Sequence, residues 1–265
     1  MTYQPVLIST GIAGWRFMQR TYQAQLEAFS GSNVRQRENA YFLDKIKEVN
    51  TAEDLVSDRR MLSVALGAFG LEGDLNNTYF IRKILEDGTG SQDALANRLA
   101  DKRYREFSSA FGLGPGEFSK TSLLTDMEEI VRKNQVAQFE ISVGEQDDTM
   151  RTALYAQHEL ADLAQRDISD DAKWFNLMGL PPLRGMMETA LGLPASFAQL
   201  DIDRQLNVFK DKLRGLTGSE TIDQFTGPDV RDQLTTAYLA RSQIAALGVG
   251  FSSAQTALTL LQNIR

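Results

Sequence analysis

The sequence contains no cysteine, a single histidine (His158) and only six prolines in 265 residues. The absence of cysteine excludes disulfides, thiolate nucleophiles and cysteine-ligated metal sites. With one histidine, the side chain that most often acts as a general base is scarce. Few prolines leave long uninterrupted segments in which helices can extend. The composition therefore excludes thiol chemistry and leaves only one histidine as a possible general base.

Long apolar runs and basic clusters are missing too. No run approaches the roughly 18 residues that a membrane helix requires, and the first 15 residues lack the basic flank and apolar core of a secretory signal. We therefore expect a soluble protein without a membrane span. The net charge of −7 argues against a nucleic-acid partner. Nine acids and two bases fall within residues 140–172, where we expect one solvated acidic stretch.

Apolar residues recur with helical periodicity almost throughout, which predicts an all-α multi-helix bundle. We expect an N-terminal amphipathic helix within residues 1–35, a helical body over 36–232 and a low-charge C-terminal helix over 233–265. Two lobes, about 36–120 and 168–232, are expected to be joined by a long central helical region, 121–167, and the terminal helices are expected to pair. The individual helices are predicted at 9–29, 38–49, 52–69, 74–86, 91–111, 121–143, 146–166, 169–178, 182–191, 201–214, 228–247 and 251–264.

Local signals mark several helix ends. Glycine followed by leucine after a helical segment predicts a left-handed stop, with the leucine folding back onto the last turn. Three copies of this pattern, at Gly70, Gly112 and Gly192, are joined by a looser fourth at Gly179, whose expected partner is Phe175. Side chains that can cap a helix start are expected at Thr51, Ser91 and Ser169.

Two stretches resemble catalytic motifs, and each lacks a required part. His158 and Asp162 are one helical turn apart, but a zinc-protease helix has a second histidine in place of Asp162. Residues 112–121 approach a phosphate-binding loop, but Pro115 removes a backbone amide and Glu117 would repel phosphate. We expect a turn between helices there, capped by Ser119 or Thr121. No catalytic residue, cofactor or metal site is predicted.

Adjacent carboxylates occur at Asp147 and Asp148, and again at Asp170 and Asp171. Neighbouring helical side chains point about 100° apart, so the two carboxylates of a pair do not face one substrate. Helix capping or solvation is the expected role.

An apolar group surrounds two consecutive prolines in the second half of the chain. Its members are predicted to be core residues, although a partner-binding groove is an alternative. The group comprises Trp174, Phe175, Met178, Leu180, Met186 and Met187.

Both ends of the chain can present an apolar seam with alternating spacings of three and four residues. The last 33 residues contain no acid and only two arginines. Both helices are therefore candidates for contacts with protein partners or for self-association. The alternative is that they pack on the protein's own core. The candidate contact residues are Trp15, Tyr22, Leu26 and Phe29 at the N-terminal end and Phe251, Leu258 and Leu261 at the C-terminal end.

Long phrases within residues 40–213 are similar to a known bacterial family. They are Tyr41–Gly73 (YFLDKIKEVNTAEDLVSDRRMLSVALGAFGLEG), Phe80–Leu113, Val143–Tyr155 (VGEQDDTMRTALY) and Ile168–Leu213. These segments resemble the uncharacterised domain-of-unknown-function family "twelve-seventeen", whose members are often encoded among flagellar genes. The resemblance implies a flagellum-associated role and transfers no catalytic residue.

Two functions are therefore compatible with the sequence. The first is a non-enzymatic structural or assembly protein of the flagellum, which would be exported without a cleaved signal. The second is a cytoplasmic helical adaptor or chaperone that binds flagellar proteins through an apolar groove near Trp174 and Met187. A metal-dependent hydrolase built on His158 is a remote third.

Overall fold

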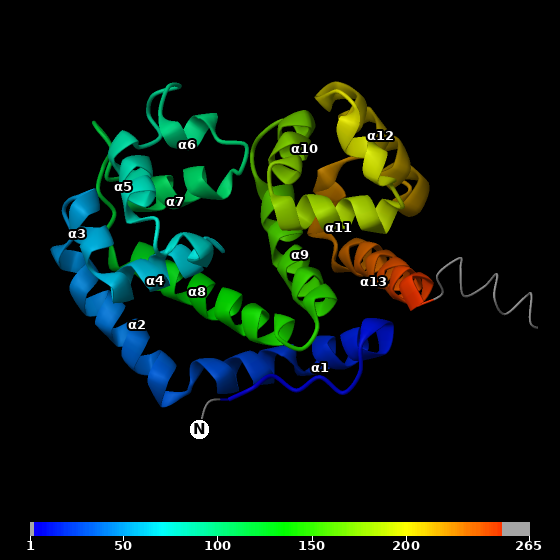
Figure 1. Ribbon diagram of the computed structural model, residues 1–265, viewed down its shortest axis with the longest axis horizontal. Coiled ribbons are helices and arrows are strands. Elements are labelled where there is room, and N and C mark those ends of the chain that lie inside the picture. Colours follow the sequence, from blue (N-terminus) through cyan, green and yellow to red (C-terminus); the bar gives the residue numbers. More distant parts are fainter. Residues whose placement is uncertain (1–2, 251–265) are drawn as a thin grey trace, which may run out of the picture. The chain divides into compact units, whose positions relative to one another are not determined.

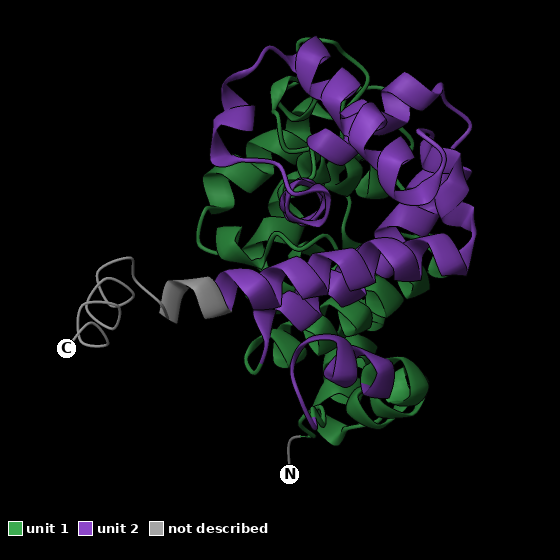
Figure 2. Ribbon diagram, turned by 90° about the vertical axis from the view of Figure 1, so that its right-hand side faces the viewer, with its two compact units in different colours: residues 1–7, 18–146, 179–181 green, residues 8–17, 147–178, 182–265 purple. Residues whose placement is uncertain are grey.

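The computed structural model describes residues 3–250 of the chain. Within that range it contains thirteen α-helices, four short 3-10 helices and no strand, so the all-α prediction is confirmed (Figure 1). Two compact units are present (Figure 2). Unit 1 comprises Met1–Leu7, Met18–Gln146 and Gly179–Pro181, and unit 2 comprises Ile8–Phe17, Asp147–Met178 and Pro182–Arg265.

Unit 1 consists of nearly consecutive helices around one apolar core. Phe42, Leu62, Phe107 and Phe111 are among its fully buried side chains. The elements are the second part of α1 (Gly11–Ser30), α2 (Asn33–Lys45), η1 (Ile46–Glu48), α3 (Ala52–Ser57), α4 (Arg59–Gly67), η2 (Glu72–Asp74), α5 (Thr78–Asp87), α6 (Leu95–Arg98), α7 (Arg103–Phe111) and α8 (Leu124–Gly144).

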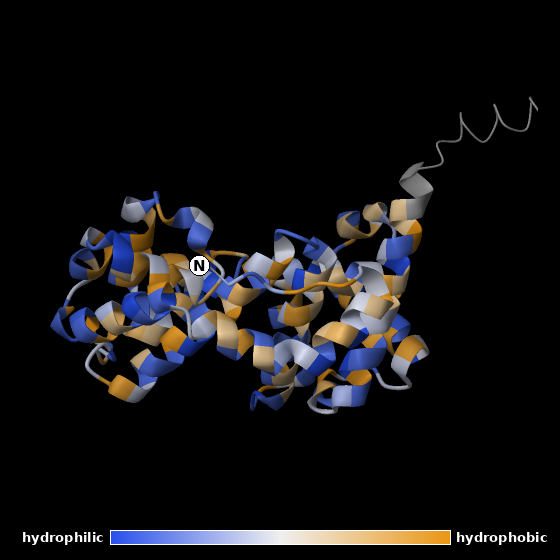
Figure 3. Cartoon of the chain, turned by 90° about the horizontal axis from the view of Figure 1, so that it is seen from below, coloured by the Kyte–Doolittle hydropathy of each residue, from blue (hydrophilic) through white to orange (hydrophobic). Residues whose placement is uncertain are grey.

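Unit 2 has its own core, in which Trp174 stacks on Phe209 with ring centroids 5.7 Å apart and Phe197 meets Phe209 edge-on at 4.8 Å. Its elements are the first part of α1, α9 (Asp148–Gln165), α10 (Asp170–Met178), α11 (Pro181–Leu191), η3 (Ala195–Gln199), α12 (Ile202–Thr217), η4 (Ile222–Thr226) and α13 (Pro228–Gly250). The helices combine hydrophilic and hydrophobic residues, as Figure 3 shows by colour. Such amphipathic helices bury one face and leave the other in water.

The units divide the chain differently from the predicted lobes. Of the predicted joining region, residues 121–146 belong to unit 1 and residues 147–167 to unit 2. Helix α1 contributes residues to both units instead of forming a segment of its own. No helix within residues 3–250 is long and apolar enough to cross a membrane.

The predicted helix over 52–69 is wrong, because it is two helices separated at Asp58. Thr51 starts the first with a capping box, in which its side chain accepts the Asp54 amide and the Asp54 carboxylate accepts the Thr51 amide. This cap was predicted and is confirmed. Asp58 adopts an extended backbone and accepts hydrogen bonds from the amides of Arg60 and Met61. Two strong caps seven residues apart therefore make two short helices.

The predicted helix over 91–111 is also wrong, since α6 and α7 are separated by an irregular turn. The Ser91 hydroxyl accepts the Asp93 amide in a turn, and α6 begins only at Leu95, so Ser91 is not a helix cap. The prediction for Ser169 is confirmed, because its hydroxyl accepts the Ala172 amide at 3.3 Å.

Three of the four predicted glycine stops are confirmed. Gly70, Gly112 and Gly192 have φ between 62° and 67°, a region that side chains with a Cβ atom disfavour. After Gly70, the Leu71 amide donates to the Leu66 carbonyl, as expected for a helix stop in which the chain folds back. Gly179 is not in this region, and its expected partner Phe175 is partly exposed, so the fourth prediction is wrong.

Candidate functional site

The N-terminal residues that were predicted to contact a partner make contacts within the protein itself. In unit 2, Trp15 is buried and its indole nitrogen donates to Asp232 Oδ1 of α13 at 3.0 Å. Arg16 pairs with the other oxygen of Asp232 at 2.8 Å. The Asp232 carboxylate of α13 therefore binds two side chains of α1.

The later residues of α1 pack within unit 1. Tyr22 and Phe29 both meet the ring of Phe139 on α8 edge-on, with centroids 5.5 and 5.6 Å away. Burial, together with the nearby Glu140 carboxylate, raises the pKa of Tyr22 above its usual value. Leu26 is half-buried and Phe29 is buried. In this conformation Trp15 and Phe29 lie in the protein's own core, as the alternative interpretation of the seam required.

At the other end, Phe251, Leu258 and Leu261 lie outside the described residues. The preceding segment of α13 is described, and there Gln243, Ile244, Ala245 and Ala246 are all exposed. Successive helical residues point about 100° apart, so four in a row cover every side of the helix. This turn of α13 is therefore an exposed, uncharged stretch of helix, in which only the Gln243 side chain is known to lie against another element, at Gly11 of α1.

The apolar group around Trp174 is core, as predicted, with one exception. Trp174, Met178, Leu180, Met186 and Met187 are buried, whereas Phe175 is 38% exposed. The alternative of an open groove at Trp174 and Met187 is contradicted, because neither side chain reaches the surface.

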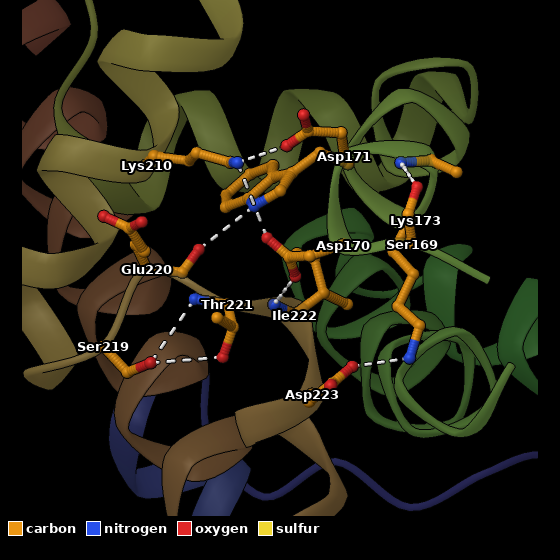
Figure 4. Close-up of polar contacts among 12 residues, drawn as sticks. Ser169, Asp170, Asp171, Lys173, Lys210, Ser219, Glu220, Thr221, Ile222 and Asp223 are labelled. Carbon is orange, nitrogen blue, oxygen red and sulfur yellow. Dashed lines mark hydrogen bonds and ion pairs between the residues drawn. The ribbon is translucent and has the colours of Figure 1, made fainter. Parts of the chain in front are cut away.

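A cluster of hydrogen bonds and ion pairs, called the polar cluster below, joins α10 to η4 and the residues just before it (Figure 4). Lys173 is only 5% exposed, and its ammonium group donates to the Ala164 carbonyl at 2.7 Å and pairs with Asp223. The Trp174 indole nitrogen donates to the Glu220 carbonyl at 3.0 Å. A buried ammonium needs such partners, because an unpaired charge in the core is strongly unfavourable.

The adjacent carboxylates of the acidic stretch serve the fold. Asp147 caps α9 by accepting the amides of Thr149 and Met150, which confirms capping at this pair. Asp170 accepts the Ile222 amide at 2.8 Å, and Lys210 pairs with Asp170 and Asp171 (Figure 4). Several acids of this stretch are thus engaged, and Glu140 is buried. Five of the nine acids are exposed, so the expectation of a solvated acidic stretch is confirmed for them and wrong for Glu140.

The two motif lookalikes have structural roles. His158 is half-buried and meets the Tyr155 ring edge-on, and within residues 3–250 no group of three or more potential metal-ligating side chains occurs. The loop over 112–121 does donate an amide to an anion, but this anion is the chain's own Glu117. Its carboxylate accepts the Thr89 amide and hydroxyl at 2.5 and 2.8 Å and the Gly114 amide at 3.3 Å.

Close backbone packing explains the glycines of this loop. A Cβ atom added at Gly114 would overlap the Cα atom of Gly88, which itself has a φ of 65°. The expected cap at Ser119 or Thr121 is wrong, because α8 begins at Leu124 without a side-chain cap. The Thr121 hydroxyl instead donates to the Val49 carbonyl at 2.8 Å.

Comparisons with known proteins agree with the helical architecture. The family model described as "Protein of unknown function (DUF1217)" matches residues 68–230, which is more than half of the chain. The chain belongs to the DUF1217 family. No curated protein matches it. A crystal structure of protein AGR_C_984 from Agrobacterium tumefaciens is similar in fold, with a TM-score of 0.73 and 21% identity over 91% of this chain and 97% of that one.

The DUF1217 match divides the features described above into two sets. Glu117, Lys173 and Trp174 lie inside the matched range, as does most of the polar cluster. Trp15, Phe29 and Ile244 lie outside it. The hydrogen bonds of Glu117 and of the polar cluster are therefore within the DUF1217 region. The candidate contact residues of the two terminal helices lie on either side of that region.

Replacing Glu117 by glutamine is expected to lower the free energy of unfolding by about 1–2 kcal/mol at pH 7, because the new amide would face the Gly114 N–H with a donor. Burial alone would raise the pKa of Glu117, but hydrogen bonds from Thr89 and Gly114 outweigh it and lower that pKa. A lowered pKa means that the stabilisation is present above the unfolded-state value, near 4.5, and is lost as pH falls through the folded-state pKa.

Urea unfolding at pH 7 and at progressively lower pH measures this effect. The difference between the wild-type protein and Glu117→Gln should shrink on acidification. Glu128→Gln, at an exposed position of α8, is the control and should be neutral. A difference that stays constant below pH 4 would show that the carboxylate charge is not involved.

Proposed function

We propose that this DUF1217 protein is a non-enzymatic structural or assembly component of the bacterial flagellum, and that α13 is its principal contact with a partner. The flagellar assignment is supported by the family resemblance, since such proteins are often encoded among flagellar genes. The contact assignment is supported by the exposed turn Gln243–Ala246. This turn is the observation that carries the proposal.

The chemistry of α13 fits a helical protein partner. Ile244 is 67% exposed, and the chain carries no acid after Asp232. An uncharged helical turn with an exposed isoleucine and alanines gains free energy by packing against an apolar helix or groove. We expect a flagellar subunit that presents such a surface.

The non-enzymatic assignment is supported by the partners of the charged groups, which form structural hydrogen bonds and ion pairs. The Lys173 ammonium group is held by the Ala164 carbonyl and Asp223, and the Glu117 carboxylate binds backbone amides. Asp147 caps a helix. These groups stabilise the fold. We expect their removal to lower the free energy of unfolding and not to remove a catalytic activity.

Export tests the flagellar proposal at the level of the cell. In the native bacterium, tagged protein should reach the culture supernatant or the flagellum only when the flagellar export gate works. Deleting the gene should impair flagellation and swimming. Normal flagella and swimming in the deletion strain would overturn the proposal.

Replacing Ile244 by aspartate is expected to abolish the partner contact while leaving the fold intact, because surface substitutions usually change stability by less than about 0.5 kcal/mol. The measurement combines swimming in soft agar with recovery of the protein in purified flagella. Val34→Asp is a matched control at an exposed apolar position of α2. Equal swimming defects for both variants, or none for Ile244→Asp, would contradict the role of α13.

The cytoplasmic adaptor remains the second candidate, and localisation separates it from the first. An adaptor should stay in the cytosol and copurify with flagellar subunits even when the export gate is inactive. The groove first considered for it is closed, since Trp174 and Met187 are buried. An adaptor would have to use another surface, and α13 is the one that the structure offers.

A further inference from the structure

A pocket of about 300 Å³ lies within unit 1, among α2, α4 and α8. This volume is at the lower end of the range for small-molecule sites. The pocket does not involve α13, the helix on which the proposed function rests. Its lining consists of Arg35, Glu38, Arg59, Arg60, Ser63, Val64, Leu75, Asn134 and Gln138.

The charge of this lining is positive, with three arginines against one glutamate. Arg35 is paired with Glu38 at 3.3 Å. Arg59 donates to the neutral side chain of Asn76 at 2.9 Å, and the Arg60 guanidinium lies 3.7 Å from the centroid of the Tyr41 ring. Neither Arg59 nor Arg60 has a carboxylate within ion-pair distance among the described residues, so two guanidinium groups retain donors for a ligand.

Asp58, the acid that precedes these two arginines in the chain, is already engaged. One oxygen of Asp58 accepts the amides of Arg60 and Met61, and the other accepts the Tyr41 hydroxyl at 2.6 Å. Asp58 therefore attracts Arg60 only at longer range. Arg59 and Arg60 also stand in the first turn of α4, where the helix dipole adds positive potential.

A second observation points to a ligand. Asn134 lines the pocket, is only 5% exposed, and its side-chain oxygen has no hydrogen-bond partner. Buried polar groups without partners are rare and call for an explanation. Asn134 can occupy this position only because residue 67 is glycine. A Cβ atom at residue 67 would overlap the Asn134 amide oxygen. The unpartnered oxygen of Asn134 thus lies against Gly67 at the pocket wall.

We propose that this pocket binds a small organic anion. Arg59 and Arg60 would hold its carboxylate or phosphate group, since guanidinium groups bind both with paired hydrogen bonds. The Asn134 oxygen, which is an acceptor, would favour an anion that also carries a hydrogen-bond donor. The pocket volume matches a small molecule, and an acidic side chain of a partner protein is the alternative that the test below separates from it.

Isothermal titration of the full chain tests this assignment with three probes: succinate, inorganic phosphate and a short glutamate-rich peptide. Succinate or phosphate should bind one to one, more weakly at higher salt. The double variant Arg59→Gln/Arg60→Gln should weaken binding at least tenfold. Arg37→Gln, on α2 and outside the lining, should leave it unchanged.

Several outcomes would overturn the proposal. Absence of binding by all three probes would do so, as would an equal loss in Arg37→Gln, which would indicate a general charge effect. Binding of the peptide alone would overturn the assignment to a free small anion. Circular dichroism of each variant confirms that the fold is retained, so a loss of binding reports on the pocket.

Discussion

Replacing Phe139 by alanine is expected to lower the free energy of unfolding of unit 1 by about 3–5 kcal/mol, the range for a large aromatic side chain removed from a core. Phe139 is fully buried, and its ring is the common partner of Tyr22 and Phe29. The variant should lose the hydrophobic contribution of the ring together with both edge-on contacts. Residues 18–30 of α1 should therefore loosen first.

Chemical unfolding followed by circular dichroism measures the loss, and hydrogen exchange locates it. We expect the amides of residues 18–30 to exchange faster in Phe139→Ala than in the wild-type protein. Phe118→Ala is the matched control, because this phenylalanine is 71% exposed and its truncation should be nearly neutral. Unchanged protection of residues 18–30 in Phe139→Ala would show that α1 is held by other contacts.

Features that depend on neighbouring residues alone could be predicted from the sequence. The Thr51 cap and the stops at Gly70 and Gly192 each involve a short stretch of chain, so their geometry follows from residue type and spacing. The helical periodicity similarly sufficed for the fold class, because each amphipathic face repeats over several turns.

The break at Asp58 shows where local reasoning fails. The periodic pattern continues across residues 52–69, so the sequence favours one helix there. Asp58 can either lie inside a helix or cap the next one, since its side chain competes for backbone amides. The hydrogen bond from Tyr41, seventeen residues earlier, supports the cap. Such a distant partner cannot be identified from residue spacing.

Candidate sites were harder to predict than helices, because the same pattern serves different purposes. An apolar seam at Trp15, Tyr22 and Phe29 is equally suited to a partner protein or to the core. The deciding groups, Asp232 and Phe139, come from distant helices. Glu117 was expected to repel an anion, yet its carboxylate is itself bound by the amides of Thr89 and Gly114. The pocket near Arg59 and Asn134 has no sequence motif, since α2, α4 and α8 each contribute part of it.

In unit 2, replacing Trp174 by alanine is expected to lower the free energy of unfolding by about 3–5 kcal/mol. Its ring stacks on Phe209 and is fully buried, and its indole nitrogen donates to the Glu220 carbonyl. Trp174→Ala removes both interactions and leaves a cavity. Trp174→Phe keeps an aromatic ring against Phe209 but leaves the Glu220 carbonyl without its donor, so we expect a smaller loss.

Fluorescence-detected urea unfolding can follow these variants, because Trp15, the other tryptophan of the chain, lies in the same unit and remains as the probe. Phe175→Ala is the control at the adjacent, partly exposed position, and its effect should be below about 1 kcal/mol. The order of loss should be Trp174→Ala, then Trp174→Phe, then Phe175→Ala. Equal losses for the two Trp174 variants would mean that the hydrogen bond to Glu220, and not the stacked ring, dominates. In that case the polar contacts of α10 would contribute more to the stability of unit 2 than the aromatic core does.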